Sequence, residues 1–153
     1  MANTYHQLYV QSVFAVKYRA SVIKPEWRNE FCGVIGNLIN EVGCKNIIVN
    51  GVEDHVHCFF GLLPTLAISD VLQKIKSNSS GWLNKQNFMK HRFAWQSGYG
   101  AFAYSRSHLN NVYQYILNQE THHKKKTFKA EYIELPKCFS IEYDEKYLFH
   151  DLI

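Results

Sequence analysis

The sequence predicts an α+β protein with a ferredoxin-like fold, in which a split β-α-β antiparallel sheet carries helices and one further helix is appended. Four segments have the alternation or composition of strands, and three have apolar residues at helical spacing. Their order is strand, helix, strand, strand, helix, strand, helix. A chain of 153 residues, 46% of them hydrophobic, is long enough for one core. We therefore expect a single domain over residues 1–153, of which about 136–153 form a C-terminal tail.

The first strand and first helix follow from two different periodicities. A strand is predicted over residues 5–18, where apolar and polar side chains alternate as they do in a half-buried strand. The apolar members of this alternation are Leu8, Val10, Phe14 and Val16. A helix is predicted over residues 25–42, because Pro25 suits the first helical position and Gly43 suits a C-terminal cap.

A hairpin and a second helix come next. Strands are predicted over residues 46–52 and 55–63, and the polar Glu53-Asp54 link between them is short enough for a hairpin. Apolar residues then return to helical spacing, which predicts the second helix. These residues are Ile68, Val71, Leu72, Ile75, Trp82 and Leu83.

The last predicted strand precedes the appended helix. A short strand is expected over residues 101–105, after an aromatic stretch that two glycines interrupt. Ser107 is the expected cap of a third helix that reaches about His123. Residues 127–135 are expected to form a small extra helix that Pro136 stops.

Composition excludes several classes of protein. No apolar run approaches the roughly 18 residues that span a bilayer, and the first twenty residues lack the pattern of a signal peptide, so we expect a cytoplasmic protein. The four cysteines show no C-x-x-C spacing, which argues against a disulfide framework or a cysteine zinc site. The net charge of +4 is compatible with a polyanionic partner but is common without one.

Two histidines are candidate metal ligands. In the segment Asp54-His55-Val56-His57, the imidazoles are two residues apart on a predicted strand. Side chains two apart on a strand point to the same face, with Cα atoms roughly 6.5 to 7 Å apart, so both rings could bind one metal ion. Eight histidines in 153 residues also make one such spacing unsurprising by chance, so the pair alone is a weak signal.

The third predicted helix has an apolar arc and a polar stripe. We expect the apolar arc to face the core; its members are Leu109, Val112, Tyr113, Ile116 and Leu117. The polar stripe consists of His108, Asn111, Tyr115, Asn118, Gln119 and His122. Tyr115 and Gln119 are four residues apart, so a phenol and a carboxamide project together. A solvated helix face is the alternative interpretation, but such faces are usually filled with Glu and Lys.

The two motifs together resemble a known family. A strand with Asp54-His55-Val56-His57, followed by a helix with Tyr115-Ile116-Leu117-Asn118-Gln119, is similar to the single-tyrosine HUH transposases of small bacterial insertion sequences. The resemblance extends from residue 5 to 120 and includes the Trp95-Gln96-Ser97-Gly98-Tyr99-Gly100 stretch. It implies a DNA transposase that performs metal-dependent cleavage and strand transfer of single-stranded DNA through a 5′-phosphotyrosine intermediate.

The resemblance also implies roles for four residues. His55, His57 and Gln119 would bind a divalent metal, Mg²⁺ or Mn²⁺, and Tyr115 would be the nucleophile. The chemistry is coherent, because a divalent cation on a phosphate oxygen withdraws negative charge and orients phosphorus for attack. The implied partners are single-stranded DNA with hairpin-containing element ends and a second copy of the chain, in a homodimer. Whether Tyr115 would serve its own subunit or the other one is left open.

Basic and aromatic residues elsewhere are weaker candidates. Four residues are expected to contact DNA phosphates, although each could be an ordinary solvated charge; they are Lys74, Lys76, Arg92 and Arg106. Tyr113 is expected in the core. For Tyr99 and Tyr104 we favour packing over stacking on bases. The basic run at residues 124–126 is only a weak indication of a DNA-facing patch.

Two other functions remain open at this stage. A non-catalytic ferredoxin-like module that binds single-stranded nucleic acid would explain the fold and the basic excess, but not the combination of two histidines, a tyrosine and a glutamine. A phosphoesterase with paired His-x-Thr/Ser motifs would need a second such motif, which the sequence lacks. A metal requirement for strand cleavage distinguishes the transposase from the binding module.

Overall fold

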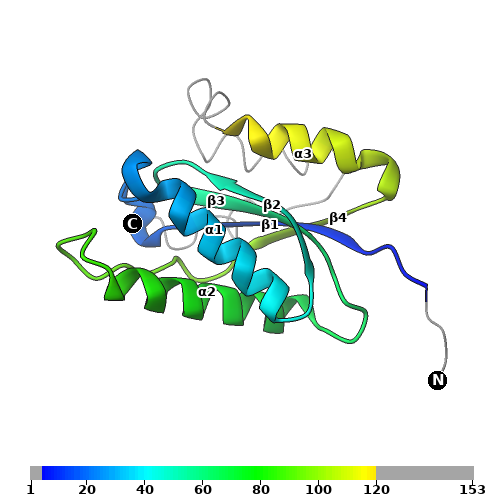
Figure 1. The fold of residues 1–153 in the computed structure, drawn as a ribbon, viewed down its shortest axis with the longest axis horizontal. Helices are drawn as coiled ribbons and strands as arrows, with labels where there is room; N and C mark the ends of the chain where they lie inside the picture. The colour runs from blue at the N-terminus through cyan, green and yellow to red at the C-terminus, as the bar shows by residue number, and fades with distance from the viewer. Residues whose placement is uncertain (1–4, 120–153) are drawn as a thin grey trace.

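The structure, a computed structural model that describes residues 5–119, is an antiparallel sheet with helices on both faces (Figure 1). The strands are β1 (Tyr9–Ala15), β2 (Lys45–Gly51), β3 (His55–Gly61) and β4 (Gly100–Tyr104). The helices are α1 (Pro25–Glu41), α2 (Ile68–Lys85) and α3 (Leu109–Leu117), with 3₁₀ turns η1 (Lys17–Arg19) and η2 (Arg106–His108).

The strand order confirms the predicted fold class. The strands lie in the order β2-β3-β1-β4, and each neighbouring pair is antiparallel. This is the ferredoxin-like arrangement, in which the two halves of the split β-α-β unit interleave at the centre of the sheet. The register places Ala15 opposite His55 and Val13 opposite His57, so the histidine pair lies against β1, the other central strand.

The two faces of the sheet have separate cores. Helices α1 and α2 cover one face, and α3 covers the other (Figure 1). Alternation along β3 sends Val56, Cys58 and Phe60 into the core under α1 and α2. Phe59 packs on the opposite face, in the cluster that α3 closes with Val112 and Ile116. His55 and His57 share the face of Phe59, as the strand period requires.

The prediction that the first strand is half-buried is wrong. β1 is shorter than residues 5–18, and after Tyr9 its residues are buried on both faces. Even Gln11 is only 1% exposed. The reason is tertiary: β1 lies between β3 and β4, and α3 covers the face that the alternation of polar residues assigned to solvent.

The remaining boundaries mostly agree with the sequence analysis. Helix α1, the hairpin, α2 and β4 each lie within a few residues of prediction. Gly43 follows α1 with a φ of 102°, the left-handed conformation expected of a C-terminal cap. The cap at Ser107 is wrong, because Ser107 lies inside η2 and His108 occupies the N-cap position of α3.

The end of the third helix also differs from prediction. Helix α3 ends at Leu117 and does not run unbroken to residue 123, since Asn118 has φ −95° and ψ 23°. Residues 120–123, the expected small helix at 127–135, the basic run at 124–126 and the tail at 136–153 lie outside the described residues.

The thiols and helices within the described range have ordinary roles. Cys32, Cys44 and Cys58 are free and buried, as expected for inert thiols. Burial raises the pKa of Cys32 to about 11, although the Arg28 guanidinium opposes the rise. Burial also raises the pKa of Cys58, by more than that of Cys32. Between residues 5 and 119 no helix is both long and apolar enough to cross a membrane.

Candidate active site

The histidine pair lies at the start of β3 on the face covered by α3. The rings of His55 and His57 are fully buried, and their centroids are 5.3 Å apart. The strand therefore brings the imidazoles together as predicted. Two neutral nitrogen donors at this spacing can bind one divalent cation.

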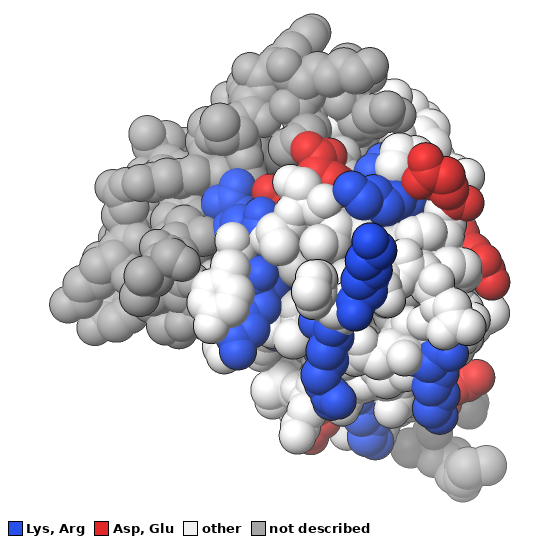
Figure 2. Space-filling model, turned by 90° about the vertical axis from the view of Figure 1, so that its left-hand side faces the viewer, with Lys and Arg blue, Asp and Glu red and all other residues white. Residues whose placement is uncertain are grey.

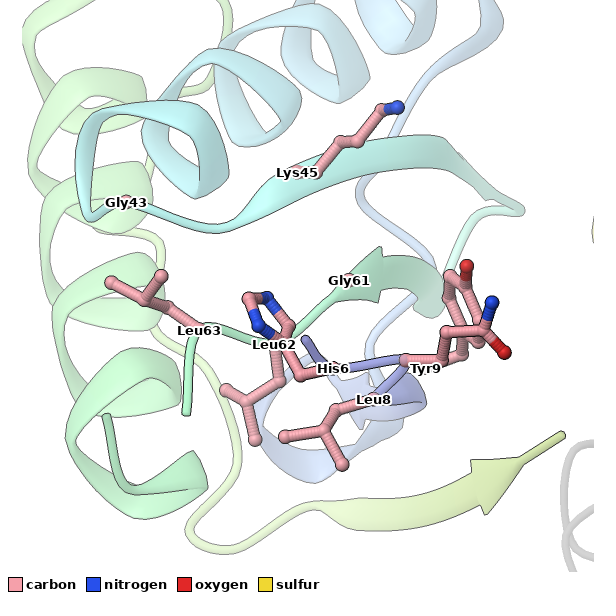
Figure 3. A pocket seen from close by; sticks show the side chains of 9 residues that line it. His6, Leu8, Tyr9, Gly43, Lys45, Gly61, Leu62 and Leu63 are labelled. Atoms are coloured by element: carbon pink, nitrogen blue, oxygen red, sulfur yellow. The ribbon is translucent and has the colours of Figure 1, made fainter. Parts of the chain in front are cut away.

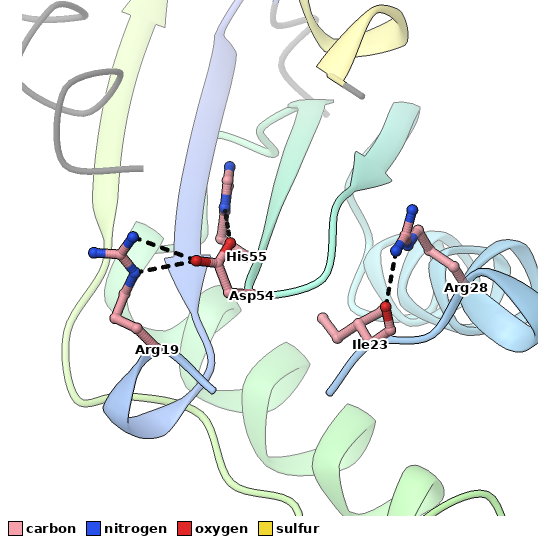
Figure 4. Close-up of polar contacts among 5 residues, drawn as sticks. All are labelled: Arg19, Ile23, Arg28, Asp54 and His55. Atoms are coloured by element: carbon pink, nitrogen blue, oxygen red, sulfur yellow. Dashed lines mark hydrogen bonds and ion pairs between the residues drawn. The ribbon is translucent and has the colours of Figure 1, made fainter. Parts of the chain in front are cut away.

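Asp54 holds His55 in place. Its Oδ1 lies 2.7 Å from Nδ1 of His55, and its Oδ2 accepts from Nε and Nη2 of Arg19, both at 3.3 Å (Figure 4). Asp54 is only 5% exposed, so this carboxylate is a buried bridge between η1 and β3. A carboxylate only accepts, so Nδ1 of His55 carries the proton and the lone pair of the neutral ring is on Nε2.

Gln11 contacts the other histidine from β1. Its Nε2 donates to Nδ1 of His57 at 2.9 Å, and its Oε1 accepts from the hydroxyl of Tyr104 at 2.7 Å. All three side chains are buried, with Gln11 between two neighbours that come from β3 and β4. In both imidazoles, therefore, Nδ1 is hydrogen-bonded, and a metal would have to bind at Nε2.

Tyr115 of α3 approaches the histidines within the same chain, and Gln119 follows two residues after the end of that helix. The ring of Tyr115 packs edge-on against that of His57, with centroids 5.8 Å apart and an interplanar angle of 77°. Gln119 is fully buried, and its Nε2 donates to the backbone oxygen of Tyr115 at 3.2 Å. Its Oε1 is buried and accepts no hydrogen bond from the described residues.

The face of α3 that turns inward differs from prediction. Val112 and Ile116 are buried as expected, but Tyr113 is 36% exposed and Leu117 is 48% exposed, so neither is a core residue. The inward-facing side chains are instead those of Tyr115, which is half-buried, and of Gln119 beyond the end of the helix, which is fully buried.

Asn50 on β2 fixes the end of α3 over the histidines. Its Nδ2 donates to the backbone oxygens of Ile116 and Leu117, at 3.0 and 3.1 Å. These carbonyls belong to the last turn of α3, where a side-chain donor acts as a C-terminal cap. Asn50 is paired with His57 across the β2-β3 ladder, which brings the cap next to the site.

The donor set fits a divalent metal. Within residues 5–119 no three or more His, Cys, Asp or Glu side chains are placed so that they alone could hold a metal ion. The third candidate donor, Oε1 of Gln119, is a carboxamide oxygen, which falls outside that description. A buried polar atom with no hydrogen bond is uncommon and calls for an explanation such as a bound ion. His55, His57 and Gln119 are the residues that would hold it.

The predicted DNA contacts are separated in the structure. Lys74, Arg92 and Arg106 are exposed, and Arg106 in η2 lies at the far end of α3 from Tyr115. Lys76 donates to the backbone oxygens of Gln96 and Gly98 at 2.8 and 2.7 Å, so its ammonium holds the segment before β4. Figure 2 shows Lys and Arg side chains spread over the end of the molecule where α1 begins and α2 ends.

Sequence reasoning missed the residues that orient the site. Gln11 and Asn50 had no recognisable motif, because their partners lie 46 and 66 residues further along the chain. Asp54 directly precedes the first histidine, and this adjacency was the available signal. Tyr104 is buried, as favoured above, whereas Tyr99 is 40% exposed.

A cavity of about 170 Å³ lies at the opposite end of the sheet from the histidines (Figure 3). It is bounded by the start of β1, the end of β3 and the loop before β2. Its lining includes Leu8, Leu62 and Leu63, with His6 and Lys45 as polar members. Because β3 begins at His55 and ends at Gly61, this cavity is separate from the candidate active site.

Comparisons with known proteins show the fold and the family of this chain. A crystal structure designated as a transposase from Deinococcus radiodurans R1 superposes with a TM-score of 0.60, 22% identity, and coverage of 78% of this chain and 95% of that one. The structure of a REP-associated tyrosine transposase bound to a REP hairpin superposes with a TM-score of 0.56 and 14% identity, and the match covers 80% of this chain and 74% of that one. No curated protein matches. The family model described as "Transposase IS200 like" matches residues 4–119. The chain belongs to the IS200-like transposase family.

Proposed function

We propose that this transposase cleaves and rejoins single-stranded DNA, with Tyr115 as the nucleophile and with a divalent metal held by His55, His57 and Gln119. The observation that carries the proposal is the meeting of the Tyr115 ring with the ring of His57, next to a fully buried Gln119 whose carboxamide oxygen accepts no hydrogen bond from the described residues. Family membership supports a transposase, and the chemistry of these four side chains supports this site as its catalytic centre.

Three of these residues would bind the metal, and Tyr115 would attack the phosphate. A metal at this site, Mg²⁺ on availability or Mn²⁺ on affinity, would draw charge from a phosphate oxygen. The three donors are neutral, so they leave the charge of a bound cation undiminished. Asp54 and Gln11 hold the imidazoles, and the α3 scaffold holds the phenol beside them.

The cleavage step exchanges one phosphoester bond for another. The phenolic oxygen of Tyr115 attacks phosphorus while the bond to the 3′-oxygen breaks; the phenol loses its proton and the leaving oxygen takes one up. The products are a 5′-phosphotyrosine and a free 3′-hydroxyl. Because the new ester retains the reactivity of the old one, another 3′-hydroxyl reverses the step and joins strands without a nucleotide cofactor.

The same proposal covers the partners. The substrate is single-stranded DNA with hairpin-containing ends, which the hairpin in the REP-associated transposase structure supports by analogy. We further propose a homodimer located in the cytoplasm, with phosphate contacts at Lys74, Lys76, Arg92 and Arg106. Tyr115 lies beside His57 of its own chain.

The test is covalent capture of labelled DNA. Oligonucleotides labelled on the 3′ side of the scissile phosphate are incubated with the protein and Mg²⁺ or Mn²⁺, then separated on a denaturing gel. The unaltered chain should form a covalent adduct that needs the metal, and Tyr115→Phe should form none while still binding DNA. Tyr113→Phe is the matched control, since Tyr113 is a more exposed tyrosine on the same helix. An adduct with Tyr115→Phe would overturn the assignment.

A further inference from the structure

With the amide of Gln11 placed as it is, the hydrogen bonds assign opposite tautomers to the two candidate metal ligands. His55 faces a carboxylate, that of Asp54, which only accepts, so its Nδ1 carries the proton. His57 faces the amide nitrogen of Gln11, which only donates, so its Nδ1 accepts. A neutral imidazole has one proton, and that of His57 is therefore on Nε2. Of the two rings, His55 alone has its Nε2 lone pair ready for a cation.

The contacts of Gln11 can be reversed without losing either of them. A carboxamide presents its oxygen and its nitrogen at equivalent positions, so a half-turn of the amide exchanges donor and acceptor. The oxygen then accepts from Nδ1–H of His57, and the nitrogen donates to the hydroxyl oxygen of Tyr104, which accepts as well as it donates. Because both contacts are already at 2.9 and 2.7 Å, no backbone movement is needed.

We infer that Gln11 and Tyr104 form a tautomer switch for His57. When a divalent cation binds Nε2 of His57, the proton moves to Nδ1 and the amide of Gln11 turns over to accept it. Gln11 is thus a positioning residue for His57, and Tyr104 is the residue that hydrogen-bonds the other end of the Gln11 amide. The inference rests on the proposed function, since it takes His57 as a ligand, and it adds two residues that come from β1 and β4.

The burial of Gln11 argues against a role that is merely structural. Gln11 is 1% exposed and occupies a central strand where an apolar residue would pack without polar cost. A glutamine that only fills this space would affect stability and leave metal affinity unchanged. A glutamine that accepts from a ligating histidine should affect metal affinity, by about 10- to 100-fold when it is lost.

Imidazole ¹⁵N NMR of the full chain, with and without Mg²⁺, reports the tautomers directly. We expect Nδ1–H for His55 in both states, and a change from Nε2–H to Nδ1–H for His57 on saturation. If Mg²⁺ changed the signals of His55 alone and left those of His57 unchanged, the switch would be overturned, while metal binding at His55 would stand. Silence of both rings would overturn the switch and the proposed metal site together.

Metal-binding titrations of three variants complete the test, with free Mn²⁺ measured by electron paramagnetic resonance and folding checked by circular dichroism. Gln11→Leu should weaken Mn²⁺ binding by about 10- to 100-fold. Gln11→Glu should bind at least as tightly as the unaltered chain, because a carboxylate accepts from both His57 and Tyr104. Equal weakening by Glu and Leu would contradict the switch.

Tyr104→Phe provides a variant that keeps the fold. It retains the ring that packs against Phe59 at 6.0 Å and removes only the hydroxyl. Mn²⁺ binding should weaken measurably, and the same change in the Gln11→Leu background should have no further effect, because both act through one amide. Unchanged affinity in Tyr104→Phe, or full additivity in the double variant, would overturn the inference even if Gln11→Glu fails to fold.

Discussion

The ring of Tyr115 on α3 stands edge-on to the ring of His57 on β3, with centroids 5.8 Å apart. A phenylalanine retains this ring contact, so Tyr115→Phe should change the free energy of unfolding by less than about 1 kcal/mol. Tyr115→Ala removes a half-buried ring and should cost about 2 kcal/mol. Urea denaturation measures both. Equal losses for Phe and Ala would show that the ring contact is not what holds the side chain.

Replacing Asp54 should weaken metal binding through His55. In Asp54→Asn the amide nitrogen can donate to Nδ1, which places the imidazole proton on Nε2 and removes the lone pair needed there. We expect Mn²⁺ affinity to fall by about 10- to 100-fold. Asp70→Asn is the control, since Asp70 is an exposed acid in the first turn of α2, on the other face of the sheet. Unaltered affinity in Asp54→Asn would remove Asp54 from the site.

Two substitutions of Asn50 test its role as the C-terminal cap of α3. Asn50→Ala removes the hydrogen bonds to the carbonyls of Ile116 and Leu117 and should destabilise the protein by about 1 kcal/mol. Asn50→Asp should be worse, because it places a negative charge at the negative end of the helix dipole. Denaturant melts of both variants test the order. An aspartate as stable as the native asparagine would contradict the cap.

Gly51 is required by close approach at the turn between β2 and β3. A Cβ there would lie 2.6 Å from the backbone oxygen of His55 and 2.7 Å from Cγ1 of Val56, and the backbone oxygen cannot move aside without shifting the strand. Gly51→Ala should therefore lower the free energy of unfolding by about 1 to 3 kcal/mol. Gly33→Ala is the matched control.

Gly33 lies on an exposed position of α1, and a Cβ there meets no atom within 4 Å. Alanine favours the helix over glycine, so Gly33→Ala should stabilise the protein by up to about 1 kcal/mol. Thermal melts of the two variants should shift in opposite directions. Equal shifts would mean that the turn has room for a side chain.

Alkaline pH should destabilise the fold through its buried thiols. Burial raises the pKa of Cys32 from 9.0 to about 11, so the folded chain holds this proton more tightly than the unfolded chain does. The stabilisation is complete below pH 9 and is lost as the pH rises toward 11. Urea denaturation across this range should show a falling free energy of unfolding. The slope should be shallower in Cys32→Ala, and an equal slope would exclude Cys32 as a source.

The sequence was sufficient for the elements that follow from local periodicity. Alternation along β3 placed His55 and His57 on one face, and helical spacing with a proline and a glycine at the ends placed α1. These features depend on the backbone period alone, so a single sequence contains them.

The inward face of α3 could not be predicted in this way. Val112 and Ile116 are flanked on one side by Tyr113 and Leu117, and on the other by Tyr115 and Gln119. Hydrophobicity favours the first side, yet the second faces the sheet. The choice depends on polar groups such as Gln11, which local reasoning cannot bring next to a helix a hundred residues later. For the same reason β1 was predicted to be half-exposed, because local reasoning cannot show that α3 covers its second face.

The division of the interior by the sheet has a consequence for hydrogen exchange. Among the described residues, 17 buried side chains pack under α1 and α2, whereas 7 pack under α3. Amides of α3 should therefore exchange through a local opening that costs less free energy than global unfolding, while those of α1 exchange only when the whole domain unfolds. Among the described residues, the face of the sheet that carries the candidate active site is the one with the smaller core, and deuterium uptake measured helix by helix would reveal the difference in local stability.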